Sequence, residues 1–259
     1  MVRIIDVCSG KGGVGKTTIV ANLGLALVEL GKKVAIVDCN LTTPHLSLFF
    51  GTYSYPLTLN DFLRGEAKFE DIVYTHLFGL KIVPASLELK DLIDIDVGNL
   101  REKLRENFKD FDIVLLDSAP GLGREALIAL QAADEVLFVA NPLITSLIDV
   151  VKCNQLINSL HPKPVAIGVV LNRVKKKTYE ILVDEARQFT ELPVIGTIPE
   201  DEKVLESTNK RTPVLISHKN SPASKSIFEI AAKLAGIEHK KPKLLERFFE
   251  IFKRWKNES

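Results

Sequence analysis

Apolar, β-branched runs alternate with helix-like segments along most of this chain of 259 residues. The apolar runs cover residues 4–8, 34–37, 80–83, 113–116, 136–140, 165–171 and 194–198. They are continuous rather than alternating, which is typical of strands that are covered on both faces. Helical patterns lie between them, at residues 17–30, 100–108, 124–132, 145–160, 179–189 and 224–234. This order predicts an α/β fold with one doubly wound, mostly parallel sheet and helices on both faces.

The composition is that of an ordinary globular protein and excludes several classes. Hydrophobic residues make up 46% of the chain and charged residues 26%, which excludes a mostly disordered protein. The net charge is +1, which argues against a whole-surface nucleic-acid binder. No apolar run is long enough to span a membrane, and the N-terminus has no signal-peptide pattern. Cys8, Cys39 and Cys153 lie far apart, so we expect reduced cysteines and a cytoplasmic location.

A glycine-rich segment connects the first predicted strand to the first predicted helix. Residues 10–17 fit the pattern G-x-x-x-x-G-K-S/T. Glycines allow successive backbone N–H groups to point at phosphate oxygens, and the helix N-terminus adds its positive dipole end. Lys16 would contact the β- and γ-phosphates, and the Thr17 hydroxyl would ligate Mg²⁺. We therefore predict a P-loop NTPase that binds ATP or ADP with Mg²⁺. The predicted loop contacts are Gly10, Lys11, Gly12, Gly13, Val14, Gly15, Lys16, Thr17 and Thr18.

Two other apolar runs end in acidic residues. The run at 113–116 leads into Asp117 and resembles a Walker B strand, whose carboxylate holds the Mg²⁺ shell. The run at 34–37 leads into Asp38, which could organise the same shell or a water molecule. After Asp117, the glycine-containing residues 118–123 resemble a switch loop that moves when the γ-phosphate leaves. The predicted metal site consists of Thr17, Asp38 and Asp117.

The early lysine in the loop places the chain in a narrower group. The segment Lys-Gly-Gly-Val-Gly-Lys-Thr, residues 11–17, resembles the deviant Walker A loop of the MinD/ParA ATPases. In that family the first lysine, here Lys11, reaches across a homodimer to the partner's ATP, which implies a catalytic role for Lys11 beside Lys16. The resemblance covers residues 2 to about 236 and is closest to archaeal MinD-like proteins. It also implies that Asn172, Arg173 and Pro199 border the adenine, where the Asn172 amide can pair with the base edge.

The family's first switch region usually contains Asp-x-Asp, and the second Asp orients the attacking water. This chain has Asp38 at the first position but Asn40 at the second. Asn can hydrogen-bond a water molecule, yet it cannot accept a proton from it. The predicted catalytic residues are Lys11, Lys16, Asp38 and Asn40. Because Asn40 cannot accept a proton, we predict slow ATP hydrolysis and a long-lived ATP-bound state.

The sequence changes character near its C-terminus. We expect a MinD-like domain at residues 1–236, a linker at 237–242 and an amphipathic helix at 243–256. Apolar residues of this helix fall within an arc of roughly 160°, opposite the charged residues. The predicted membrane contacts are Leu244, Leu245, Phe248, Phe249, Phe252 and Trp255. This pattern is typical of a helix that lies in an anionic membrane surface, and MinD proteins end in such a helix. Packing on the domain itself or on a partner protein is the alternative.

These features favour a MinD-like ATPase that dimerises with ATP and binds the inner face of the cell membrane as a peripheral protein. It would position other cellular components through an unidentified activator or cargo. The main alternative is a ParA-like ATPase that binds nonspecific DNA, although the near-neutral domain and the amphipathic tail argue against nucleic acid. An iron–sulfur carrier would need paired cysteines, which the sequence lacks. A nucleotide-locked scaffold is supported only by Asn40.

Overall fold

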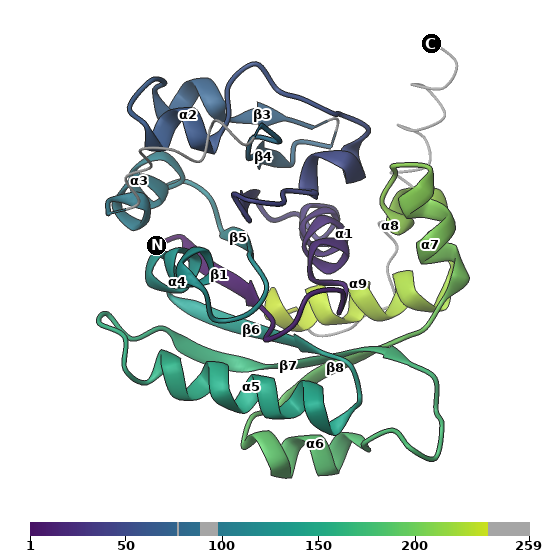
Figure 1. Cartoon of the computed structure of the whole chain (residues 1–259). Coiled ribbons are helices and arrows are strands. Elements are labelled where there is room, and N and C mark those ends of the chain that lie inside the picture. The colour runs from purple at the N-terminus through teal and green to yellow at the C-terminus, as the bar shows by residue number, and fades with distance from the viewer. Residues whose placement is uncertain (77, 89–97, 238–259) are drawn as a thin grey trace.

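The computed structural model describes residues 1–76, 78–88 and 98–237 (Figure 1). The strands among these residues are β1 (Arg3–Cys8), β2 (Val34–Cys39), β3 (Tyr74–Thr75), β4 (Lys81–Val83), β5 (Ile113–Ser118), β6 (Glu135–Ala140), β7 (Val165–Val174) and β8 (Val194–Pro199). The α-helices are α1 (Lys16–Glu29), α2 (Leu59–Leu63), α3 (Leu100–Asn107), α4 (Arg124–Ala132), α5 (Ile144–Ile157), α6 (Val183–Thr190), α7 (Glu202–Asn209), α8 (Val214–Ser217) and α9 (Pro222–Leu234). Two 3₁₀ helices, η1 (Leu46–Phe50) and η2 (Phe69–Ile72), complete the described elements.

All eight strands form one sheet in the order β3-β4-β2-β5-β1-β6-β7-β8. Every neighbouring pair is parallel except β3 and β4, which are antiparallel. The strand order reverses at β1, which lies between β5 and β6. Such a reversal opens a crevice at the carboxyl ends of the strands, where ligands bind in folds of this type. The predicted doubly wound, mostly parallel sheet is confirmed.

Helices cover both faces of the sheet, which explains why its central strands are continuously apolar. On one face, Val7 and Leu137 of the sheet belong to the same buried cluster as Leu23 of α1 and Ile230 of α9. On the other face, β6 and β7 pack against α5 (Figure 1). Burial on both sides removes most apolar area of each strand from water, so alternation with polar residues is absent.

Several elements differ from the sequence expectation. The helix expected at residues 179–189 begins at Val183, because its first residues form a loop. In that loop the Glu180 carboxylate accepts hydrogen bonds from the backbone N–H groups of Lys175 and Lys177, and the Ile181 N–H donates to the Pro142 carbonyl. The sequence pattern does not predict η1, α2, η2, β3 and α8, because each is too short to show a clear hydrophobic period. It does not predict α7 either, because only Val204 and Leu205 of that helix are apolar.

The end of the described chain is fixed to its beginning. Gly236 has a φ of 67° and closes α9. Arg3 Nη1 donates to the Leu234 carbonyl at 2.7 Å, which joins α9 to β1. The predicted linker beyond Ile237 and the whole predicted helix at 243–256 lie outside the described residues.

The three cysteines are buried and free, as expected. Within residues 1–76, 78–88 and 98–237, no helix has the length and apolar character needed to cross a membrane.

Candidate functional site

The glycine-rich loop leaves the carboxyl end of β1 and runs into α1, at the reversal of strand order. Its shape depends on two close approaches by other elements. A Cβ atom on Gly10 would lie 2.2 Å from Asp149 Cβ of α5, and one on Gly15 would lie 2.4 Å from Asn172 Nδ2 of β7. Gly15 also has a φ of 96°, which side chains rarely adopt. Only glycine therefore fits these two positions. Gly12 and Gly13 lie on the exposed rim, whereas Val14 is buried.

Lys16 and Asp117 form the buried charged pair of the site. Lys16 Nζ lies 3.6 Å from Asp117 Oδ1, and both side chains are less than one-tenth exposed. Burial raises the pKa of Asp117, whereas Lys16 and Thr17 oppose this shift. Within the described chain, neither carboxyl oxygen of Asp117 accepts a hydrogen bond. A buried acid without donors, beside the Thr17 hydroxyl, suits a hard cation such as Mg²⁺, either directly or through water.

Asp38 lies beside Asp117, but its carboxylate is hydrogen-bonded to the loop that follows β2. The two residues are opposite one another in the β2–β5 register. Asp38 Oδ1 accepts from the Asn40 N–H and Oδ2 from the Leu46 N–H, both at 3.1 Å. Burial, followed by the nearby Asp117, raises the pKa of Asp38. Asp38 therefore stabilises residues 40–46, and only the remaining lone pairs of its carboxylate could accept a hydrogen bond from a water molecule.

The Asn40 side chain is engaged within a tight turn. Its Nδ2 donates to the Thr43 carbonyl at 2.7 Å, and its Oδ1 accepts from the N–H and hydroxyl of Thr43 at 3.3 and 3.2 Å. An aspartate could accept the last two bonds but could not donate the first. Next to this turn, the Thr42 hydroxyl and N–H both contact the Glu125 carboxylate of α4.

Lys11 occupies the exposed side of the loop. Its side chain is 52% exposed, in contrast with the buried Lys16. Lys11 Nζ lies 3.4 Å from Asp149 Oδ2 of its own chain. The two lysines of the motif therefore face different directions, one toward the sheet edge and one toward α5 and solvent.

The residues expected to border the adenine lie together at the ends of β7 and β8. Asn172 Nδ2 donates to the Val14 carbonyl at 2.6 Å, so this amide is attached to the glycine-rich loop. Arg173 is exposed and has a φ of 59°. Pro199 pairs in register with Val174. The three residues border the same end of the crevice as the loop.

Sequence reasoning missed one buried acid, Asp6 of β1. Because Val7 is opposite Asp117 in register, Asp6 points to the other face of the sheet. The nearby Ser118 hydroxyl donates to the Val7 carbonyl at 3.0 Å, so neither oxygen of Asp6 has a donor within the described residues. Burial raises the pKa of Asp6 to about 7. The signal was a single Asp within the apolar run at residues 4–8.

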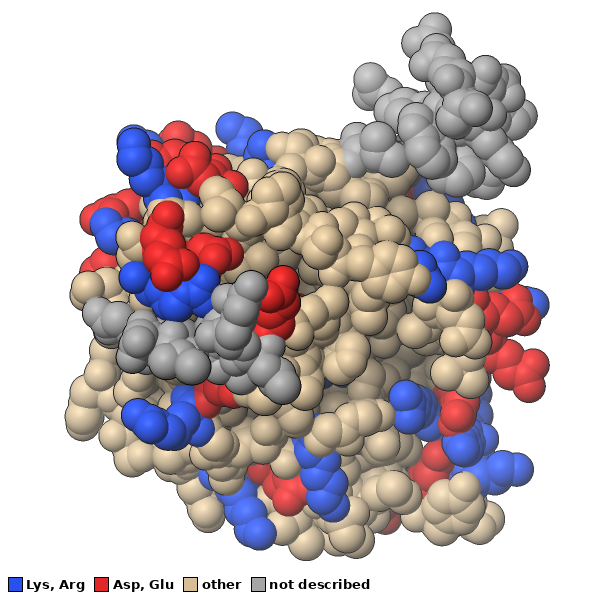
Figure 2. Space-filling model, turned by 45° about the horizontal axis from the view of Figure 1, so that its top comes forward, with Lys and Arg blue, Asp and Glu red and all other residues tan. Residues whose placement is uncertain are grey.

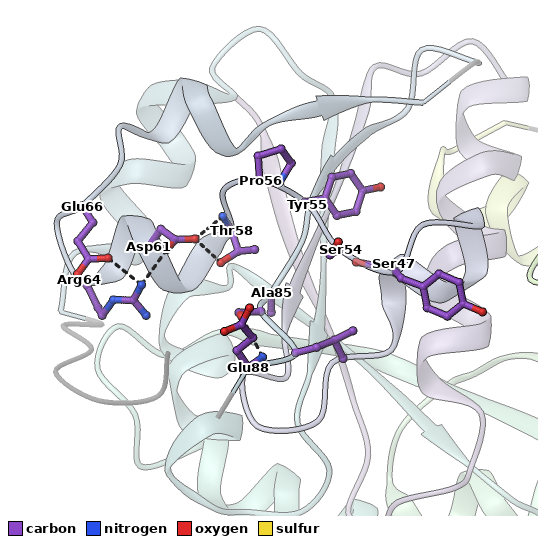
Figure 3. A pocket seen from close by; sticks show the side chains of 13 residues that line it. Ser47, Ser54, Tyr55, Pro56, Thr58, Asp61, Arg64, Glu66, Ala85 and Glu88 are labelled. Carbon is purple, nitrogen blue, oxygen red and sulfur yellow. Dashed lines mark hydrogen bonds and ion pairs between the residues drawn. The ribbon is translucent and has the colours of Figure 1, made fainter. Parts of the chain in front are cut away.

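A polar hollow of about 630 Å³ lies beside the segment that follows the Asn40 turn (Figure 3). Its wall contains a small ion-pair network in which Arg64 Nη2 contacts Asp61 at 2.8 Å and Glu66 at 2.7 Å. Ser47, the second residue of η1, lines the opposite side. The hollow is separate from the glycine-rich loop, and three of its charged residues, Asp61, Arg64 and Glu66, partner one another.

Comparison with known proteins agrees with this geometry. Residues 5–214 match the model of the CobQ/CobB/MinD/ParA nucleotide binding domain. The chain is 38% identical over 239 residues to an uncharacterised ATP-binding protein of Methanocaldococcus jannaschii, covering 92% of this chain and 90% of that protein. It is 31% identical over 244 residues to the septum site-determining protein MinD of Thermotoga maritima, with 91% and 89% covered.

A solved structure is similar over nearly the whole described chain. The septum site-determining protein MinD of Pyrococcus horikoshii, complexed with Mg-ADP, aligns with a TM-score of 0.86 and 34% identity. The alignment covers 93% of this chain and all of that one.

Proposed function

The chain belongs to the MinD/ParA family of P-loop ATPases, and from this premise we propose that ATP makes it a membrane-bound dimer. In the proposed cycle the ADP-bound protein is a monomer that leaves the membrane, and the ATP-bound dimer stays at the inner face of the cell membrane. There it positions other cellular components through a protein activator or cargo.

Nucleotide and Mg²⁺ are the cofactors of the chain. We assign the phosphates to the backbone N–H groups of residues 10–18 and to Lys16, since the loop surrounds the helix N-terminus and Lys16 is buried beneath it. Thr17 and Asp117 would hold Mg²⁺, with Asp38 next to Asp117 as a further carboxylate that could organise its shell. Bound Mg²⁺ supplies charge neutralisation of the phosphates. The protein's part is to position the nucleotide and to place Lys16 where charge develops.

The observation that carries the dimer proposal is the exposed position of Lys11. A loop lysine that is about half exposed, while Lys16 already occupies the inner position, can exchange its contact with Asp149 for one with a second molecule. Beside the Lys11–Asp149 pair, the apolar side chains of Leu143, Ile144 and Ile148 are 38–45% exposed. Exposed apolar side chains next to a charged site are typical of an interface. A second protomer would cover them and receive Lys11.

The proposed membrane contact is the helix at residues 243–256. A single short amphipathic helix binds a bilayer weakly. Two copies on one dimer bind far more tightly, because the second helix is already near the surface when the first has bound. ATP-dependent dimerisation would therefore keep the protein on the membrane.

We further propose that hydrolysis is slow. Asn40 cannot take a proton from water, and its amide is used by Thr43. Residues 40–43 include no acidic residue, and the Glu125 carboxylate that reaches this turn is already bonded to Thr42. The proposed ATP state is accordingly long-lived until an activator rearranges the turn.

Size-exclusion chromatography with ADP and with ATP plus Mg²⁺ tests the dimer. We expect a dimer only with ATP and Mg²⁺. Lys11→Ala should remain a monomer while still binding ATP, and the exposed-lysine control Lys109→Ala should dimerise like the wild type. A wild-type protein that stays monomeric with ATP and Mg²⁺ contradicts the proposal.

The same chromatography fractions, tested for liposome and DNA binding, distinguish a membrane-binding ATPase from a DNA-partitioning ATPase. We expect the dimer to sediment with anionic liposomes and to leave duplex DNA unshifted in a gel. On the face shown in Figure 2, positive and negative side chains are interspersed, which does not favour a phosphate backbone. DNA binding by the ATP form without liposome binding would instead favour the ParA-like function.

A further inference from the structure

An aromatic groove lies away from the nucleotide site, between η1, the β3–β4 hairpin and the turn that joins α7 to α8. Its volume is about 810 Å³. The rings of Phe50 and His76 meet edge to face at 4.9 Å, and His76 and Phe78 are 5.7 Å apart between centroids. The rings of Tyr55 and Tyr74, which also line the groove, are tilted against each other with centroids 4.3 Å apart. This lining offers aromatic and apolar surface to a ligand.

The charged residues that line the groove are all positive among the described residues. Lys210 and Arg211 line it and are exposed, and its described lining residues include no Asp or Glu. The Arg211 guanidinium lies 4.1 Å from the centroid of the Tyr53 ring, which orients it. The polar hollow in Figure 3 is the opposite case, since Asp61, Glu66 and Glu88 line it. The groove therefore favours a negatively charged ligand and the hollow does not.

Two features of the groove are suited to hydrogen bonds with a ligand, namely a buried ring nitrogen of His76 and the edge strand β3. His76 Nδ1 is buried and accepts or donates no hydrogen bond within the described chain. Burial lowers the pKa of His76, so the ring is neutral at neutral pH and can pair with a ligand without carrying charge. Strand β3 is the last strand of the sheet and pairs only with β4 among the described strands, so no described strand occupies its outer side.

We propose that this groove binds an extended segment of a partner protein that carries both acidic and aromatic or aliphatic side chains. The apolar side chains enter between Phe50 and Phe78, the carboxylates meet Lys210 and Arg211, and the backbone adds to the open edge of β3. The proposal gives the chemistry of the activator or cargo, and it rests on the proposed function only for that biological role.

Other features of the chain agree with this choice of ligand. The chain's own C-terminal residues 240–259 contain seven Lys and Arg against three Asp and Glu, a net of +4, so they match a positive groove poorly. The top of Figure 1, where β3 and β4 lie, comes forward in Figure 2, and a broad area of that face has no charged side chains. Through the Leu46 N–H, η1 is also bonded to Asp38, so one wall of the groove begins at the nucleotide site.

The test selects ligands from a phage-displayed library of random twelve-residue peptides on the full chain. We expect enrichment of peptides that combine acidic with aromatic or aliphatic residues. A synthetic peptide of the most enriched sequence should bind at least ten times more weakly to the double variant Lys210→Glu/Arg211→Glu. It should bind normally to Lys109→Glu/Lys225→Glu, which has the same net charge but alters exposed residues elsewhere. Enrichment of peptides without acids, or equal binding to both double variants, overturns the proposal.

A second variant fills the groove instead of changing its charge. Thr75 is exposed and lines the groove, so Thr75→Trp adds bulk there without removing buried packing. We expect it to abolish peptide binding while the thermal unfolding midpoint and ATP-dependent dimerisation stay at wild-type values. Undiminished peptide binding by Thr75→Trp also overturns the proposal. Because ATP-dependent dimerisation is measured on the same proteins, failure of the proposed dimer switch can be distinguished from failure of the proposed peptide site.

Discussion

The charged residues of the site differ in what surrounds them, and this decides their roles. Lys16 and Asp117 are buried together, whereas Lys11 is half exposed and pairs with Asp149. Asp38 gives its oxygens to backbone N–H groups, and Asn40 gives its amide to Thr43. Residues of similar chemistry thus divide into those that we propose to face the nucleotide and those that shape the loops around it.

Replacing Asn40 with Asp tests the cause of slow hydrolysis. The carboxylate cannot donate to the Thr43 carbonyl, so the turn should loosen and release a group that can orient water and take its proton. We expect the rate of phosphate release to rise by about 10-fold or more. Asn40→Ala is the control, since it also frees the turn but supplies no carboxylate. An unchanged rate in Asn40→Asp means that Asn40 is not what limits hydrolysis.

Replacing Asp6 with Asn tests the buried acid on the far side of β1. Its folded-state pKa of about 7 exceeds the usual value of 3.8, so the folded protein holds this proton more tightly than the unfolded chain. Stability from Asp6 is therefore full below about pH 4 and declines as the pH rises to about 7. Since Asn resembles the protonated acid, Asp6→Asn should be more stable than wild type by about 2–4 kcal/mol at pH 8.

Urea unfolding at pH 8 and pH 5 measures this difference. We expect the advantage of Asp6→Asn to shrink at pH 5, where the wild-type carboxyl is already largely protonated. The exposed control Asp110→Asn should show no such change. An advantage that is equal at both pH values would mean that Asp6 is not protonated in the folded protein.

At the scale of elements, the glycine-rich loop is held by three neighbours that are distant in sequence. Asn172 of β7 donates to Val14, Asp149 of α5 lies against Gly10, and the Gly121 N–H donates to the Ser9 carbonyl at 2.9 Å. The loop is thus held in place without nucleotide, which would lower the entropy cost of forming the proposed phosphate site.

Two glycine substitutions separate packing of the loop from phosphate contact. Gly10→Ala would place a Cβ 2.2 Å from Asp149 Cβ, so α5 must shift. The corresponding distance for Gly12→Ala is 3.8 Å, to Pro120. Without nucleotide, we expect Gly10→Ala to lower the free energy of unfolding by about 1–3 kcal/mol and Gly12→Ala by less than about 0.5 kcal/mol. Equal losses in urea unfolding would contradict the close contact with α5.

At the scale of the whole molecule, the strand order places every predicted site residue of the described chain at one edge of the sheet. β1, β2, β5, β7 and β8 all end there, so Lys16, Asp38, Asp117 and Asn172 meet although they are far apart in sequence. The exposed apolar residues of α5 adjoin this edge, which links nucleotide binding to the proposed dimer.

Removing residues 243–259 tests how the dimer is coupled to the membrane. We expect the truncated protein to dimerise with ATP and Mg²⁺ but to remain in the supernatant when anionic liposomes are pelleted. Replacing only Phe248 and Trp255 with Ser should have the same effect in the full-length chain. If the truncated protein still sediments with liposomes in an ATP-dependent way, the membrane contact lies elsewhere.

The sequence by itself determined the features that depend on local order. Continuous apolar runs and intervening helical patterns predicted the doubly wound sheet, because burial on both faces imposes that pattern. The loop at residues 10–17 and the strand ending in Asp117 were equally visible, since backbone geometry and Mg²⁺ chemistry require those residue types at that spacing. Short elements such as α7 and η1 have no clear period, although the Asp201 N-cap of α7 could have indicated it.

Only the tertiary structure decided which groups are already satisfied and which are not. The Asn40 bonds to Thr43, the pairing of Lys11 with Asp149 and the missing donors of Asp6 depend on loop geometry or on residues more than a hundred positions away. The aromatic groove likewise joins residues near 50, 76 and 211. A hydrogen bond or a burial energy is set by distance in space, and a sequence pattern records only distance along the chain.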